Sequence, residues 1–390
     1  MYQKSPSYSS AMDCKQAIAT ISLGQPKLHD IRTKLYEIAG CGIKAIELFY
    51  DDLETLACTI SQESSQPSSR ESCLKAAEVI RDLCHELQLT VLNLQPFRFY
   101  EGLLDRQETD RLQSEVLPLW IEILQILGAD TILVASNFLG PDPQTGQPRT
   151  TGDIRVIVDD LRVMAVKGLA CSPPVRIAYE ALAWGDHVKT WEKAWEIVQK
   201  VDLPNFGLVL DTFNLAAIAY ADPATENGRL YNDEKLAAFH LRSSLEKMLS
   251  DIDMSRVFVV QIADAERLCS PLQEGHPFYV AGQPSRMSWS RNARLFLCES
   301  DRGGYLPVLD IVHILIKLGW TGHLSHEVFS RTLSDAAPET PLNHAARASR
   351  SWNAMLAALM QKDELEYKGG YHEKETVLSP EIGFRVELEL

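Results

Sequence analysis

The sequence predicts a single α/β domain folded as a (β/α)8 TIM barrel, and three observations support that prediction. Eight short apolar runs recur along the 390-residue chain, and amphipathic helical stretches lie between them. Strands that alternate with helices form parallel sheets, and eight such units close into a barrel. No Gly-rich phosphate fingerprint follows the first run, which argues against a doubly wound open sheet.

The predicted strands are rich in aliphatic and aromatic residues. They cover residues 17–24, 45–50, 90–96, 131–137, 176–182, 206–213, 257–263 and 322–329. Helical patterns with one apolar face occupy residues 30–42, 71–88 and 305–319. The last helix begins at Thr340, a capping residue type, with Pro341 in its first turn, and we expect it to end near Met360.

Some segments do not fit the repeating pattern. We expect residues 1–14 and 362–390 to be terminal tails, so that the barrel domain occupies residues 15–361. Residues 59–72 read as a polar loop, and residues 264–303 read as a long, mostly irregular connection after the seventh strand. Because a connection of that length inside a compact domain usually has a function, we expect it to contribute to the site.

Composition narrows the possible partners. The formal net charge of −15 argues against nucleic acid and anionic membranes, since both are bound through basic surfaces. The eight cysteines are scattered, which is typical of reduced structural thiols. The N-terminus lacks the apolar core of a signal peptide, and no apolar run reaches the length that spans a membrane. We therefore expect a cytoplasmic protein with a small-molecule partner.

Oxygen-bearing side chains stand at the ends of the last four predicted strands. They are Glu180, Asp211, Gln261 and Glu327, and strand parity places all four on the inward face. Barrels of this class carry their active sites at the C-terminal ends of the strands. Three crowded acids repel one another unless a cation lies between them.

These four residues predict a metal site. Any one of the acids alone is more simply explained as a cap or an ion-pair partner, but four donors in register favour a shared cation. A ligand set made only of oxygen atoms suits one divalent Mg²⁺ or Mn²⁺ ion better than zinc, and Co²⁺ also fits.

Arginines at other strand ends indicate an anionic substrate. Arg98 follows the third strand in the aromatic stretch LQPFRFYEG, and Arg291 and Arg294 lie in the long connection. Arginine binds a carboxylate or phosphate through two parallel hydrogen bonds. Among the histidines, His187 follows the fifth strand and is our candidate for proton transfer, whereas His326 has the opposite parity to Glu327 and is expected to be structural.

The strand-end pattern of Glu, Asp, Gln and Glu resembles the xylose isomerase-like TIM barrels, a superfamily of sugar-phosphate isomerases and epimerases. Within it, YEALAWGDHV, IELFYDDL, LQPFRFYEG and SRNARLF resemble the 3-dehydroshikimate dehydratases of quinate and shikimate catabolism, the fungal type in particular. The resemblance covers roughly residues 17–335. It implies a lyase that dehydrates 3-dehydroshikimate to protocatechuate (3,4-dihydroxybenzoate) with a divalent metal.

The resemblance also implies roles for individual residues. Glu180, Asp211, Gln261 and Glu327 would be the metal ligands, and Arg98, Ser290, Arg291 and Arg294 would hold the carboxylate and hydroxyls of the substrate. His187, Glu180 and Glu327 would take part in catalysis. Two features depart from the family: Asn214 replaces a histidine that often stands three residues after the aspartate, and LCESDRGG replaces a Gly/Pro-rich turn.

Alternatives remain at this point. A ketose or sugar-phosphate isomerase or epimerase would use the same metal, and the aromatic stretch around Arg98 is what favours a flat carboxylated substrate. An apurinic-site endonuclease would need more histidine ligands and a less acidic chain. A non-catalytic metabolite-binding barrel would be expected to have lost some of the donors. The alternating C-terminal stretch GFRVELEL leaves a homo-oligomer open.

Overall fold

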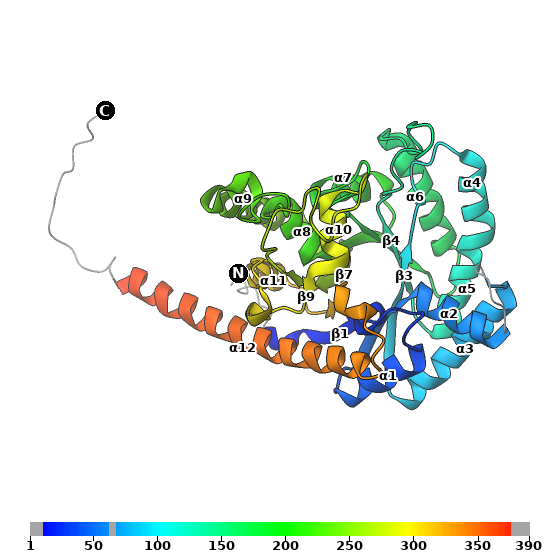
Figure 1. Cartoon of the computed structure of the whole chain (residues 1–390), viewed down its shortest axis with the longest axis horizontal. Coiled ribbons are helices and arrows are strands. Elements are labelled where there is room, and N and C mark those ends of the chain that lie inside the picture. The colour runs from blue at the N-terminus through cyan, green and yellow to red at the C-terminus, as the bar shows by residue number, and fades with distance from the viewer. Residues whose placement is uncertain (1–10, 62–67, 376–390) are drawn as a thin grey trace, which may run out of the picture.

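The computed structural model describes residues 11–61 and 68–375, and it confirms the predicted barrel (Figure 1). Eight parallel strands close in the order β1-β10-β7-β6-β5-β4-β3-β2. Their bounds are β1 Lys15–Ala19, β2 Ala45–Phe49, β3 Thr90–Phe97, β4 Thr131–Ala135, β5 Arg176–Glu180, β6 Phe206–Asp211, β7 Val257–Ile262 and β10 His323–His326. Each lies within or close to a predicted run.

The helices surround the barrel. They are α1 Ile31–Gly40, α2 Tyr50–Ser61, α3 Arg70–Glu86, α4 Arg106–Arg111, α5 Leu117–Leu127, α6 Ile154–Leu169, α7 Trp191–Val201, α8 Thr212–Ala219, α9 Glu234–Asp251, α10 Ser285–Ala293, α11 Val308–Lys317 and α12 Thr340–Glu375. Several begin at a side chain that caps the first turn: Asp30, Ser69 and Asp153 each accept a hydrogen bond from a backbone N–H of that turn.

Strand periodicity separates two apolar layers. Residues that point outward pack against the helices and form the main core, while Leu133, Ala178, Val209 and Val259 point inward and fill the barrel. Glu180 and Asp211 lie two residues after Ala178 and Val209, so they have the same inward orientation. The polar residues at the strand ends therefore lie directly above an apolar layer that fills the barrel.

The connection after the seventh strand contains a short helix that the sequence pattern did not indicate. It contains the two-stranded β8 Asp264–Ala265 and β9 Arg294–Leu295, and helix α10 lies between them. Most of residues 264–303 lie outside these elements, so the expectation of a mostly irregular connection is confirmed, but α10 was not predicted because this serine- and arginine-rich segment lacks a continuous apolar stripe. Asp264 fixes the base of this connection by accepting backbone hydrogen bonds from Tyr305 and Leu306.

The last helix extends well past the predicted end near Met360, since α12 continues to Glu375. The expected boundary between barrel and tail at residue 361 therefore falls inside a helix, because the sequence after Met360 offers good helix formers such as Gln, Lys, Glu and Leu. Arg347 of α12 forms a buried ion pair with Glu299, so the helix also holds the end of the long connection. The stretch GFRVELEL and residues 1–10 lie outside the described residues.

No helix within residues 11–61 and 68–375 is both long enough and apolar enough to cross a membrane. The cytoplasmic location and the homo-oligomer stay predictions.

Candidate active site

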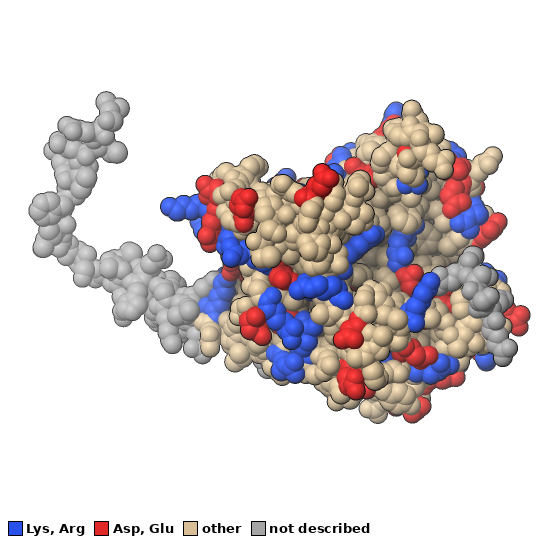
Figure 2. Space-filling view, in the orientation of Figure 1, with Lys and Arg blue, Asp and Glu red and all other residues tan. Residues whose placement is uncertain are grey.

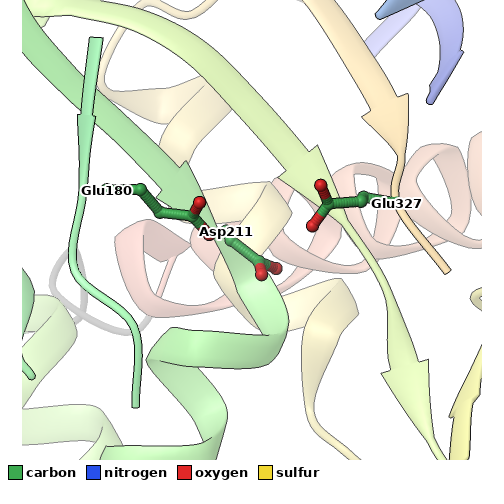
Figure 3. A group of neighbouring side chains, drawn as sticks. All are labelled: Glu180, Asp211 and Glu327. Atoms are coloured by element: carbon green, nitrogen blue, oxygen red, sulfur yellow. The ribbon is translucent and has the colours of Figure 1, made fainter. Parts of the chain in front are cut away.

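Three carboxylates meet at the C-terminal end of the barrel. Glu180 ends β5, Asp211 ends β6, and Glu327 directly follows β10. Each offers one oxygen, and these three oxygens lie within 4.8 Å of one another. Figure 3 shows the side chains converging from separate strands. The structure thus brings together the three acids that strand parity predicted to be inward.

Gln261 joins this cluster through register. On the sheet it lies beside Asp211 of β6 and beside Ser325 of β10, which precedes Glu327 by two residues. Its side chain therefore emerges between Asp211 and Glu327. Its Nε2 donates to Oε1 of Glu327 over 3.2 Å. Its Oε1 is buried and has no hydrogen-bond partner among the described residues.

Because the three carboxyl groups are buried, it is energetically unfavourable for all of them to be charged at once. Burial raises the pKa of Glu180 well above the usual range, and the nearby charges of Glu327 and Asp211 raise it further. Burial also raises the pKa of Glu327 to about 8 and that of Asp211 above its ordinary value, although Arg294 opposes both shifts. The cluster therefore favours a bound cation or bound protons.

The residues present fit a divalent metal. The three carboxylates and the unpartnered Oε1 of Gln261 form an oxygen-only donor set in a buried site. Hard cations such as Mg²⁺ and Mn²⁺ prefer such donors. Glu180, Asp211, Gln261 and Glu327 are the residues that would hold the ion.

Arg294 lies within the acidic cluster, although we expected it to contact the substrate. Its Nη1 donates to Asp211 Oδ2 over 2.9 Å and to Glu327 Oε2 over 3.2 Å. Its Nε donates to Ser290 Oγ over 3.0 Å, and its guanidinium stacks 4.2 Å from the Phe213 ring. Arg294 also lines the substrate-sized cavity described below, so the guanidinium contacts both regions.

Asn214 orients two of the acids. Its Nδ2 donates to Glu180 Oε1 and to Asp211 Oδ2, each over 2.8 Å, and its Oδ1 accepts from the backbone N–H of Ala183. Asn214 is therefore an amide held in place that binds carboxylate oxygens of Glu180 and Asp211. Its side chain has no group that titrates near neutral pH.

Glu47 is a site residue that the sequence analysis missed. It lies on β2, is fully buried, and accepts hydrogen bonds from Asn93 Nδ2 over 2.8 Å and from Gln261 Nε2 over 3.0 Å. Burial raises its pKa, and these amides oppose the shift. The available signal was a lone acid inside the apolar stretch AIELF, on the same strand face as the other inward residues.

A cavity of about 370 Å³ opens above the cluster, between the strand ends and the long connection. Its polar lining includes Glu180, Glu327, Gln95, Arg98, Ser290, Arg291 and Arg294, and its apolar lining includes Phe49, Phe99, Phe138, Trp184 and Phe329. Figure 2 shows a hollow on this face of the molecule, with Lys and Arg side chains at its edges. The volume and the mixed lining are typical of a site for a small cyclic molecule.

Arg98 and Arg291 supply the positive charge at the cavity. Arg98 forms an ion pair with Asp51 and lies 5.1 Å above the Phe49 ring. Arg291 donates to Gln283, and burial together with the nearby charge of Arg98 lowers its pKa. Both arginines line the cavity, so an anion bound there would have two guanidinium groups as possible partners.

His187 lies outside the cavity. Its side chain is exposed, and its Nε2 lies 3.1 Å from the Thr150 hydroxyl in the connection after β4. The structure therefore does not bring it together with Glu180 and Glu327. His326 packs against the rings of Phe296 and Trp352 on the helix side, as its parity predicted.

Comparison with known proteins agrees with this geometry. Residues 35–352 match the model of a family described as xylose isomerase-like TIM barrel. The chain belongs to this family. Its members share the barrel observed here, and the resemblance noted from the strand-end residues is confirmed at that level.

Relatives within this family are more specific. The chain is 41% identical over 352 residues to the 3-dehydroshikimate dehydratase of Neurospora crassa, covering 89% of this chain and 95% of that protein. It is 29% identical to the 3-dehydroshikimate dehydratase of Pseudomonas aeruginosa, covering 81% of this chain and 38% of that longer protein. A solved structure of a xylose isomerase-like TIM barrel/4-hydroxyphenylpyruvate dioxygenase fusion protein is 27% identical, with a TM-score of 0.64, covering 91% of this chain and 44% of that chain.

Proposed function

We propose that this protein is a 3-dehydroshikimate dehydratase, a hydro-lyase that removes water from 3-dehydroshikimate to give protocatechuate. The observation that carries the proposal is the 41% identity to the Neurospora crassa dehydratase, which extends over nearly the full length of both chains. The site supports it independently, since a buried acid cluster and a pair of arginines border one cavity.

The substrate suits the cavity chemically. It is a six-membered ring that carries a carboxylate, a ketone and hydroxyl groups, one of them β to the ketone. Arg98 and Arg291 would bind the carboxylate, and Phe49, Phe99 and Phe138 would pack against the ring. In this arrangement the ketone would face Glu180 and Glu327, which line the same cavity.

Elimination of water needs a base for the ring C–H and an acid for the leaving hydroxyl. A divalent cation, Mg²⁺ or Mn²⁺ by donor type, would act when bound as a Lewis acid toward the ketone oxygen and so acidify the neighbouring C–H. Glu180 and Glu327 line the cavity, so their carboxyl groups are placed to exchange protons with a bound substrate.

His187 stays a prediction as a proton-transfer residue. Its exposed ring would have to move with the connection that carries Thr150 before it could reach the cavity. We therefore propose that Glu180 and Glu327, which line the cavity, are the preferred candidates for proton transfer.

A ketose isomerase or epimerase on the same barrel is the second candidate. It would use the same cluster, but a neutral sugar would give the arginines around Arg98 no anionic partner, and a sugar phosphate would make no use of the aromatic side chains, which suit a flat carboxylated ring. A non-catalytic metabolite-binding barrel is disfavoured by the complete set of donors at Glu180, Asp211, Gln261 and Glu327.

An ultraviolet assay tests the proposal. Protein treated with a chelator is mixed with 3-dehydroshikimate, alone or with Mg²⁺, Mn²⁺ or Co²⁺, and protocatechuate is followed by its absorbance. We expect product only when metal is restored. Folded protein that forms no protocatechuate with any of the metals would overturn the proposal, and a screen of keto sugars would then be the next step.

A further inference from the structure

We infer that Glu47 is a positioning residue that orients the amide of Gln261, so that the amide oxygen is the atom presented to the proposed cation. The inference rests on the cation site proposed above and does not depend on the identity of the substrate. Glu47 acts through Gln261 and is not itself one of the proposed ligands.

The contact between the two residues crosses the interior of the barrel. Glu47 lies on β2 and Gln261 on β7, and two other strands, β1 and β10, separate them in the sheet. Both side chains are fully buried. The hydrogen bond between them therefore does not follow from strand pairing and depends on the inward orientation of both residues.

The chemistry of this contact selects one orientation of the amide. Nε2 of Gln261 lies 3.0 Å from Oε2 and 3.3 Å from Oε1 of Glu47, and 3.2 Å from Oε1 of Glu327. A carboxylate only accepts hydrogen bonds, so both neighbours require the –NH₂ end of the amide. Rotating the amide by half a turn would place its oxygen against the Glu47 carboxylate, an arrangement of two acceptors without a proton.

Once the –NH₂ end is fixed, only the amide oxygen remains for another ligand. This oxygen is buried and has no hydrogen-bond partner among residues 11–61 and 68–375. A buried polar atom without a partner is rare and calls for an explanation, such as an ion. The oxygen of Gln261 is thus left to supply the fourth ligand because Glu47, which makes the shorter contact, holds the nitrogen together with Glu327.

Glu47 is itself well held. Nδ2 of Asn93 donates to its Oε2 over 2.8 Å, and Nε2 of Gln95 approaches the same oxygen at 3.4 Å, both from the neighbouring strand β3. The structure gives Glu47 no Lys or Arg partner within the described part of the chain. A glutamine would fill this space without the cost of a buried charge, but it could offer an N–H and leave the orientation of Gln261 undetermined.

Glu47→Gln tests the inference through metal affinity, without substrate or turnover. Calorimetric titration with Mn²⁺ should show binding weakened about 10- to 100-fold, as is typical when a residue that orients a metal ligand is changed. Glu101→Gln is the matched control, because Glu101 is also buried but accepts hydrogen bonds from Tyr179 and the Asn137 backbone, away from the acid cluster. It should bind Mn²⁺ as tightly as the unaltered protein.

The exchanged pair Glu47→Gln with Gln261→Glu separates orientation from folding. In that variant the amide of residue 47 donates to one oxygen of residue 261 and leaves the other oxygen free, so Mn²⁺ affinity should recover to within a few-fold. Unchanged affinity in Glu47→Gln, or a loss that the exchanged pair fails to restore, would overturn the inference. If the unaltered protein binds no Mn²⁺, the proposed cation site itself fails.

Discussion

Replacing Arg294 with methionine should destabilise the protein strongly, because it removes the positive charge from the acid cluster. The Arg294 side chain is 1% exposed, and its Nη1 contacts Asp211 at 2.9 Å and Glu327 at 3.2 Å. Removing one member of a buried ion pair costs about 3–5 kcal/mol, since the remaining charge is left without a partner. Methionine fills most of the volume, so the loss comes from charge more than from a cavity.

The measurement is the free energy of unfolding in urea at pH 8, with a chelator and again with Mn²⁺. With the chelator, Arg294→Met should lose about 3–5 kcal/mol. Mn²⁺ should stabilise the variant more than the unaltered protein, because the cation meets a cluster that has lost its other positive charge. Stabilisation by a ligand at 100 times its Kd amounts to about 2.7 kcal/mol, which is large enough to resolve.

Arg291→Met is the matched control. Arg291 is only partly shielded from solvent and its side chain donates to the neutral Gln283, so the same substitution three residues away should change the free energy of unfolding by less than about 0.5 kcal/mol. A loss below about 1 kcal/mol in Arg294→Met, or an equal Mn²⁺ effect in the variant and the unaltered protein, would refute the reasoning.

The remaining predictions concern pH, the substrate and a histidine. Burial raises the pKa of Glu180 and Glu327 in the folded state, so the folded protein holds protons that the unfolded chain releases. The free energy of unfolding without metal should therefore fall as pH rises from about 5 to 8. Urea unfolding at several pH values checks this. Over the same range Mn²⁺ affinity should rise, with proton release detected by calorimetry in two buffers. Arg98→Met should raise KM about 10- to 100-fold by removing charged hydrogen bonds to the carboxylate, and a kcat loss with unchanged KM would contradict that role. His187→Gln should leave kcat within a few-fold, because the ring lies outside the cavity, and a loss above about 100-fold would instead restore it as the proton-transfer group.

The positions that could be predicted are those where strand periodicity and chemistry agree. Glu180, Asp211, Gln261 and Glu327 each follow an apolar run with inward parity, so the alternation of the strand fixes their direction. The same alternation placed His326 on the helix side, where it packs against Trp352. The local pattern was sufficient because the direction of each of these side chains is set by the alternation within its own strand.

What could not be predicted depends on contacts between distant segments. Arg294 was assigned to the substrate, but folding of α10 and its neighbouring strands places its guanidinium against Asp211, 83 residues away in sequence. Glu47 was missed because its partner Gln261 lies 214 residues away, across the barrel. His187 follows a strand end, yet the connection after it turns the ring toward Thr150. The periodicity of a single segment cannot predict contacts between residues that lie far apart in the sequence.

The central claim is that one cation, held by the strand-end oxygens, enables turnover of 3-dehydroshikimate. The most direct test adds Mn²⁺ stepwise to chelated protein while bound Mn²⁺ and the rate of protocatechuate formation are recorded in the same samples. We predict that both rise together and level off at one ion per chain, and that Glu180→Ala loses both. A rate that is already full before Mn²⁺ binds, or that stays full in Glu180→Ala, would contradict the account.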